Sequence, residues 1–192
     1  LDSAARCHER AGQLQVAAHT YERLGRLDDA RRCLGLAGEH HQLAELAERS
    51  GHREDSIRAY AALENYFRAA TAALAVARSG IAEKYTEAVR FLEAIAKEHP
   101  DYFRGRALLA EIWAETGDTR RALTILETLL AGVAPRPEHV PVYYDYGCLL
   151  EREGFLANAR TIFRLASSLA PSYRDLKLRV SASAYTVGAG ND

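Results

Sequence analysis

Residues 12–51 read GQLQVAAHTYERLGRLDDARRCLGLAGEHHQLAELAERSG, and a glycine returns in this stretch every 13 residues. Glu64 stands at the next position in phase. The positions eight, five, four and one before each glycine are mostly small or apolar, and these separations place them on one face of an α-helix. The stretch therefore predicts helices of roughly ten residues, separated by turns in which glycine takes the left-handed conformation.

The three cysteines have no spacing that indicates a disulfide framework, because they are few and scattered: Cys7, Cys33 and Cys148. Cys7 and Cys33 lie two periods apart in the same phase. We expect both to occupy equivalent core positions in successive helical hairpins, as small buried hydrophobic residues.

Longer helices are expected from residue 64 onward, over 65–78, 85–98, 102–115, 119–130, 142–153, 156–169 and 173–185. The proline-rich segment 131–141 is the one long loop expected between them. The chain thus divides into short 13-residue repeats over 1–63, longer repeats with a C-terminal capping helix over 64–187, and a disordered tail over 188–192.

The second half resembles the tetratricopeptide repeat, a helix-turn-helix unit of 34 residues. The copy over 140–173 carries the resemblance best, through Tyr143, Tyr146, Gly147, Leu150, Gly154, Ala159, Phe163, Ala166 and Pro171. A second copy over 103–136 has Leu109, Ala110, Trp113, Gly117, Asp118, Ala122 and Leu126, but Arg106 and Ala134 at the Trp and Pro positions. An earlier half-match has Ala88, Leu92, Ile95 and Pro100. The resemblance implies an all-α fold, a right-handed α-α superhelix or solenoid of antiparallel helix pairs.

In this family the first helix of each repeat lines a concave groove that binds peptides, helices or whole domains. By position, the resemblance implies a protein-binding groove with an exposed Tyr144 among charged residues: Arg104, Glu111, Glu115, Tyr144, Asp145, Cys148, Glu151, Arg152 and Arg179. Family members that clamp a chain terminus use a Lys and an Asn. Here those pairs are Ala107 with Glu111 and Tyr144 with Cys148. We therefore expect a mixed or basic partner surface, and a folded domain rather than a short peptide.

Composition narrows the classes of partner. The formal net charge is −1, with 48% hydrophobic and 27% charged residues, which argues against broad nucleic-acid binding or a polybasic membrane patch. No apolar run approaches the ~20 residues of a membrane span. Arginine outnumbers lysine and methionine is absent, which favours a bacterial source and a fragment of a longer chain. A cytoplasmic location is expected in the absence of a signal-peptide pattern.

The hypothesis that follows is a protein-interaction scaffold or adaptor in a bacterial regulatory or assembly system, such as motility or pilus assembly, small GTPases, secretion or kinases. The alternative is a structural spacer or self-association module. An enzyme is not expected, because no phosphate loop, zinc-protease motif or nucleophile elbow is present. We expect no cofactor and no metal ion, since His40, His41 and His52 fit no ligand spacing. The basic pairs at 31–32 and 120–121 lack the interleaved aromatic residues of a nucleic-acid surface.

Overall fold

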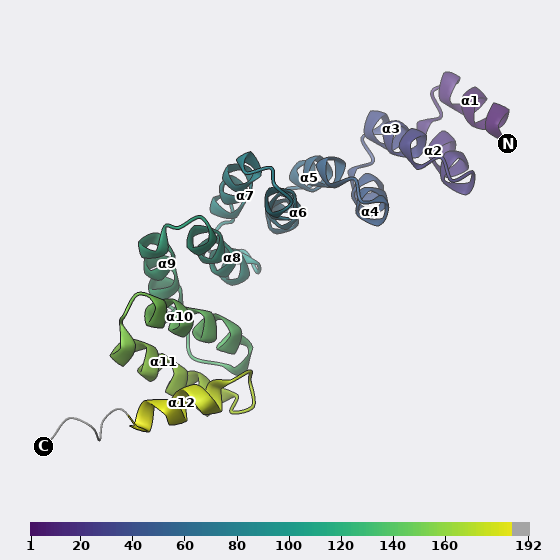
Figure 1. Cartoon of the computed structure of the whole chain (residues 1–192). Coiled ribbons are helices and arrows are strands. Elements are labelled where there is room, and N and C mark those ends of the chain that lie inside the picture. The colour runs from purple at the N-terminus through teal and green to yellow at the C-terminus, as the bar shows by residue number, and fades with distance from the viewer. Residues whose placement is uncertain (186–192) are drawn as a thin grey trace, which may run out of the picture. The chain divides into compact units, whose positions relative to one another are not determined.

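The structure, a computed structural model, describes residues 1–185 as a succession of helices joined by short turns (Figure 1). These residues include no β-strand, so the all-α fold of paired helices is confirmed. The chain forms two compact units, Leu1–His99 (unit 1) and Pro100–Asp192 (unit 2). The tail expected at 188–192 lies outside the described residues.

Unit 1 is a stack in which each helix packs against the next one along the chain. Its helices are α1 (Asp2–Arg10), α2 (Leu14–Arg23), α3 (Leu27–Ala37), α4 (His40–Ser50), α5 (Arg53–Ala62), α6 (Tyr66–Arg78) and α7 (Glu83–Glu93). The change of repeat type expected after residue 63 falls inside this unit, where α5 packs against α6. The division into two repeat types stays a prediction.

The turns of unit 1 repeat with the 13-residue period. All four glycines of the interval have positive φ, between 72° and 76°, and Glu64 follows them with φ 55°. After each of these five residues, the next backbone N–H donates to the carbonyl five residues earlier, at 2.9–3.0 Å. This bond closes the end of the helix and satisfies one of its last carbonyl groups. The predicted turn is thus confirmed even where glutamate replaces glycine.

The buried face of unit 1 is shifted from the predicted stripe. The residue one before each turn, which the pattern placed on the apolar face, is not buried in any of the five 13-residue repeats. The residue seven before each turn is buried in all five: Ala5, Ala18, Arg31, Ala44 and Ile57. A helix inside a stack has neighbours on two sides, so its buried face takes in positions beside the predicted ones. The prediction for Cys7 is wrong, since Cys7 is exposed whereas Cys33 is buried. The physical reason is that α3 packs against both α2 and α4, while α1 packs against α2.

Unit 2 continues the succession with longer helices. They are α8 (Tyr102–Glu115), α9 (Thr119–Ala131), the 3-10 turn η1 (Pro137–His139), α10 (Val140–Arg152), α11 (Leu156–Leu169) and α12 (Leu176–Tyr185). Its core is centred on the close approach of α10 and α11. A Cβ atom at Gly147 would lie 2.5 Å from Cε1 of Phe163, and Phe163 is 1% exposed. Glycine at this position lets an aromatic ring fill the space between the two helices.

Several helix boundaries differ from the sequence prediction, and three of the differences change the connecting segments. α7 ends at Glu93 and not at residue 98. α10 begins at Val140, with Pro141 in its first turn, so the predicted loop over 131–141 is shorter than expected. α12 begins at Leu176, since Arg174 has φ 44°, outside the helical region.

Candidate protein-binding surface

The residues predicted to line a groove all lie in unit 2, on alternate helices of the stack. Arg104, Glu111 and Glu115 are on α8, and Arg179 is on α12. The remaining five are on α10: Tyr144, Asp145, Cys148, Glu151 and Arg152. α8 packs against α9 and α10 against α11, so α8 and α10 are the first helices of successive pairs, and α12 packs against α11.

Carboxylates of α8 and α10 lie near one another on this side of unit 2. The Asp145 side chain is 64% exposed and lies 3.4 Å from Arg174. Partial desolvation raises the pKa of the Asp145 carboxyl, Arg174 opposes this change, and the Glu111 carboxylate raises the pKa further. The Glu111 carboxylate thus acts on Asp145 from the neighbouring first helix, and Arg174 offsets part of the repulsion. That these residues line a binding groove stays a prediction.

Tyr144 contradicts the prediction of an exposed groove tyrosine, since it is buried with 8% exposure. Its hydroxyl donates to Oδ1 of Asp175 at 2.6 Å. This bond, with burial as the second cause, raises the pKa of Tyr144 to about 12. The ring also contacts Phe163 and Tyr173, with centroids 6.0 and 5.7 Å away. Tyr144 is therefore part of the packing of the last helices and not a free anchor for a partner.

Arg179 extends from α12 over the same cluster. Its guanidinium pairs with Glu151 and donates to Asp175 at 2.9 Å. It lies 5.4 Å from the centre of the Tyr144 ring, a cation–π distance. The network ties the C-terminal helix to α10. Sequence reasoning missed Asp175, and its only sequence signal is its place directly before the first residue of α12.

Among the remaining predicted residues, Cys148 adjoins that network through Tyr144. Arg104 is 3.5 Å from Asp101, at the start of its own helix. Arg152 donates to the Thr119 hydroxyl at 3.2 Å, which links α10 to the start of α9. Cys148 is half-buried, and burial raises the pKa of its thiol, which keeps it protonated near neutral pH. Glu115 is exposed at the last residue of α8.

The described part of the chain holds no group of three or more His, Cys, Asp or Glu side chains arranged to bind a metal ion. Nor does any helix among those residues have the length and apolar character needed to cross a membrane.

Comparisons with known proteins agree with the geometry. Residues 81–140 match the sequence model of the tetratricopeptide repeat. The chain has the tetratricopeptide repeat fold. The solved structure of YrrB, a tetratricopeptide repeat protein described as having an unusual peptide-binding site, superposes with a TM-score of 0.58 at 13% identity, covering 89% of this chain and 90% of YrrB.

Two further solved structures are similar. The tetratricopeptide repeat protein TTC0263 from Thermus thermophilus has a TM-score of 0.56 at 19% identity, covering 90% of this chain and 98% of that protein. MamA has a TM-score of 0.56 at 16% identity, covering 79% of this chain and 86% of MamA. No curated protein sequence matches the chain. The identities are low, so these structures establish the fold alone. The tetratricopeptide repeat fold suggests a scaffold for protein–protein interactions, and repeats of this family are generally non-enzymatic.

Proposed function

We propose that the chain is an interaction scaffold that binds a partner protein through the side of unit 2 formed by α8, α10 and α12. The observation that supports this most is the pKa of Asp145, which is raised first by burial and further by the Glu111 carboxylate on the neighbouring first helix. Two nearby carboxylates disfavour each other's ionisation, and a basic group from a partner would relieve that repulsion.

The proposed partner presents basic side chains on a folded surface. The positions at which related proteins clamp a chain terminus hold Ala107, Glu111, Tyr144 and Cys148, and Tyr144 is occupied by its bond to Asp175. Arg104, Glu115, Glu151, Arg152 and Arg179 complete the proposed surface, with Glu151 and Arg179 acting mainly through their mutual ion pair. YrrB is described as having a peptide-binding site, so a peptide partner is the outcome that would most directly revise this proposal.

We also propose the setting predicted from composition, a regulatory or assembly system in the cytoplasm of a bacterium. The arginine-rich, methionine-free sequence supports a bacterial source. A structural spacer or self-association module is the competing proposal. It predicts no captured partner and a molecular mass that rises with protein concentration.

The test is affinity capture from a bacterial lysate with three forms of the full chain, followed by mass spectrometry. The surface variant is Glu111→Arg with Asp145→Arg. The control, Glu127→Arg with Glu138→Arg, makes the same charge change on α9 and η1. A partner kept by wild type and control but lost by the surface variant supports the proposal. A partner kept by all three forms contradicts the placement of the site.

A further inference from the structure

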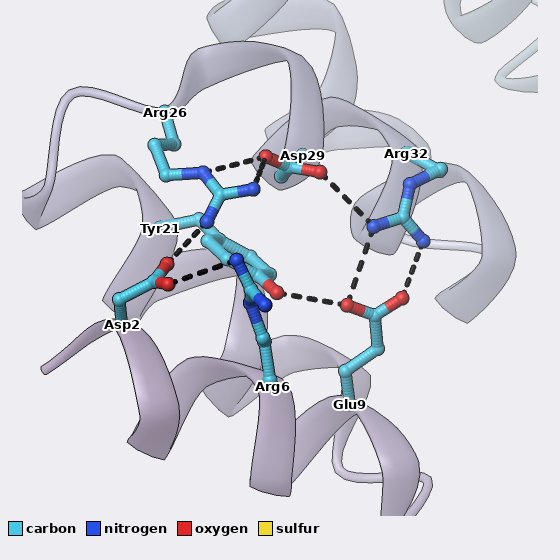
Figure 2. Close-up of polar contacts among 7 residues, drawn as sticks. All are labelled: Asp2, Arg6, Glu9, Tyr21, Arg26, Asp29 and Arg32. Carbon is cyan, nitrogen blue, oxygen red and sulfur yellow. Dashed lines mark hydrogen bonds and ion pairs between the residues drawn. The ribbon is translucent and has the colours of Figure 1, made fainter.

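A continuous chain of ion pairs and hydrogen bonds links α1, α2 and α3 at the start of unit 1, as Figure 2 shows. Both carboxylate oxygens of Glu9 accept from the Arg32 guanidinium, and the Tyr21 hydroxyl donates to Glu9 at 2.9 Å. Arg32 also donates to Asp29 at 3.1 Å. The bond from Arg32, followed by that from Tyr21, lowers the pKa of Glu9. Glu9 is therefore the carboxylate that joins α1 to both following helices.

The same arrangement recurs 26 residues later, two periods along the chain, between α3, α4 and α5. Arg58 pairs with Asp55 as Arg32 pairs with Asp29. His52 lies 3.6 Å from Asp28, where the first network has Arg26 beside Asp2. Two members are replaced by small residues. Gly35 stands at the position of Glu9, and Ala47 at the position of Tyr21. The second network thus keeps its arginine and lacks its glutamate.

A pocket of about 430 Å³ lies at this second position. Its lining comes from α3, α4 and α5 and includes Gly35 and Arg58, the counterparts of Glu9 and Arg32. Three arginines and two aspartates line it: Arg31, Arg32, Arg58, Asp28 and Asp55. Arg32 is already bound to Glu9 and Asp29 of the first network, so Arg31 and Arg58 are the two cations that a ligand would meet here.

Arg31 supplies a second, independent indication of an anionic ligand. It is 9% exposed and stands where the first network has Ala5. Its Nη2 donates to Asp28 at 2.7 Å, and its Nε lies 3.2 Å from Asp55 without hydrogen-bond geometry. Its Nη1 is buried without any hydrogen-bond partner. Because unmet buried donors are costly, an acceptor oxygen in the pocket would be stabilised.

We propose that this pocket binds the carboxylate of an aspartate or glutamate side chain from a partner protein. The partner's carboxylate would take the place that Glu9 holds in the first network, accepting from Arg58 and Arg31. A carboxylate is favoured over a phosphate group, since the two aspartates in the lining oppose a second negative charge. The site lies in unit 1 and binds an acidic group, whereas the surface proposed for unit 2 binds basic groups. The two proposals do not depend on each other.

The test follows the arginine Nε–Hε signals of the full chain by NMR during titration with N-acetyl-glutamate amide, which carries one carboxylate. N-acetyl-glutamine amide is the neutral control, and inorganic phosphate is the competing anion. We expect saturable shifts of the Arg31 and Arg58 signals in the millimolar range with the glutamate compound. Equal shifts with the glutamine compound, tighter binding of phosphate, or no saturation would each overturn the proposal.

Substitutions at Gly35 make the test sharper. Gly35→Glu restores the carboxylate of the first network and should weaken probe binding by at least about tenfold, because it competes for the same arginines. Gly35→Ala is the matched control. Its Cβ would meet only Leu43, at 3.8 Å, so the pocket stays open and binding should persist. Unchanged binding by Gly35→Glu, with an unchanged melting temperature, would contradict the proposal.

Arg58→Gln provides a test that does not alter α3. It removes the counterpart of Arg32 and should weaken the probe about fivefold or more, as expected for one lost charged hydrogen bond. Arg49→Gln is the control, since Arg49 is exposed on α4, pairs with Glu22 at 2.8 Å and does not line the pocket. Equal binding by wild type and both variants would exclude Arg58 from the site and overturn the proposed analogy with Glu9.

Discussion

Unit 1 and unit 2 stack their helices in the same succession but fill the spaces between them with different side chains. In unit 1 the helices α1–α5 have 9 to 11 residues, and many buried positions are alanine. Ion pairs link helices two apart at several places, including Glu22 with Arg49 and Glu54 with Lys84, and unit 2 has the corresponding pair of Glu151 with Arg179. In unit 2 the helices α8–α11 have 13 or 14 residues, and aromatic rings fill the core around Gly147.

The difference shows that one helical-repeat geometry tolerates two ways of packing. Short helices with small side chains bury little apolar surface each, so ionic contacts between alternate helices complement the packing. Longer helices with a glycine opposite a phenylalanine bury more surface at a single contact. We therefore expect unit 2 to respond most to changes in volume, and unit 1 to changes in turn geometry and charge.

The largest effect is expected from Phe163→Ala in unit 2. Phe163 is 1% exposed and packs on Gly147, so its removal leaves a cavity that costs about 3–5 kcal/mol of unfolding free energy. Urea unfolding followed by circular dichroism measures this loss. A change below about 1 kcal/mol would mean that the ring is not central to the packing of α10 and α11.

Gly147→Ala tests the same contact from the opposite helix. The added Cβ would lie 2.5 Å from the Phe163 ring, so we expect a loss of about 1–3 kcal/mol from overpacking. In the Phe163→Ala background the space is free, and alanine should stabilise α10 by up to about 1 kcal/mol through helix propensity. The effect of Gly147→Ala on the free energy of unfolding therefore changes sign between the two backgrounds of this double-mutant cycle. The same sign in both backgrounds would contradict the close approach.

Substitutions in the turns of unit 1 are expected to have the next largest effect on stability. Gly38 has φ 72°, so Gly38→Ala should destabilise the chain by about 1–2 kcal/mol. Glu64 has φ 55° at the same place in the repeat, so Glu64→Gly should stabilise it by up to about 1 kcal/mol. Thermal melting of the two variants measures both shifts. Opposite signs are expected, and two destabilising changes would mean that Glu64 is held by contacts of its side chain.

The charges of unit 1 give the smallest effect, and it depends on pH. The pKa of Glu9 is lowered in the folded chain, chiefly by Arg32. Its contribution to stability is therefore full above the ordinary glutamate pKa, about 4.3, and is lost as the pH falls through the lower folded-state pKa. Glu9→Gln should melt below wild type at pH 7 and together with it at pH 2. A difference that persists at pH 2 would assign the effect to packing.

The turns of unit 1 could be predicted from the sequence because a left-handed turn favours glycine, and glycine recurs there at a fixed interval. The 13-residue interval placed even the turn at Glu64, where no glycine stands. It did not predict the additional buried position that includes Arg31, because the width of a buried face depends on how many helices pack around it. The 26-residue shift from Glu9 to Gly35 could be read from the sequence, but the resulting pocket becomes visible only when α3, α4 and α5 are placed together.

The binding surface was harder to predict from the sequence than the turns. Helical position assigned the residues of α8 and α10 to the first helices of their repeats, where the structure has them. The burial of Tyr144 depends on Asp175, 31 residues further along the chain, and on where α12 begins. No periodic pattern in the sequence indicates such a long-range contact. For this reason the sequence predicts an exposed tyrosine where the structure has a buried one.

The most direct test of this comparison is hydrogen exchange by mass spectrometry on the full chain, with one aromatic core residue removed from each unit. Phe163→Ala should increase exchange in α10, α11 and α12 and leave α1–α7 unchanged, because repeats are stabilised by their nearest neighbours. Tyr21→Ala, which removes the buried donor to Glu9, should do the reverse and affect α1–α4. Uniform loss of protection along the chain in both variants would contradict the account, since it would show a single cooperative core.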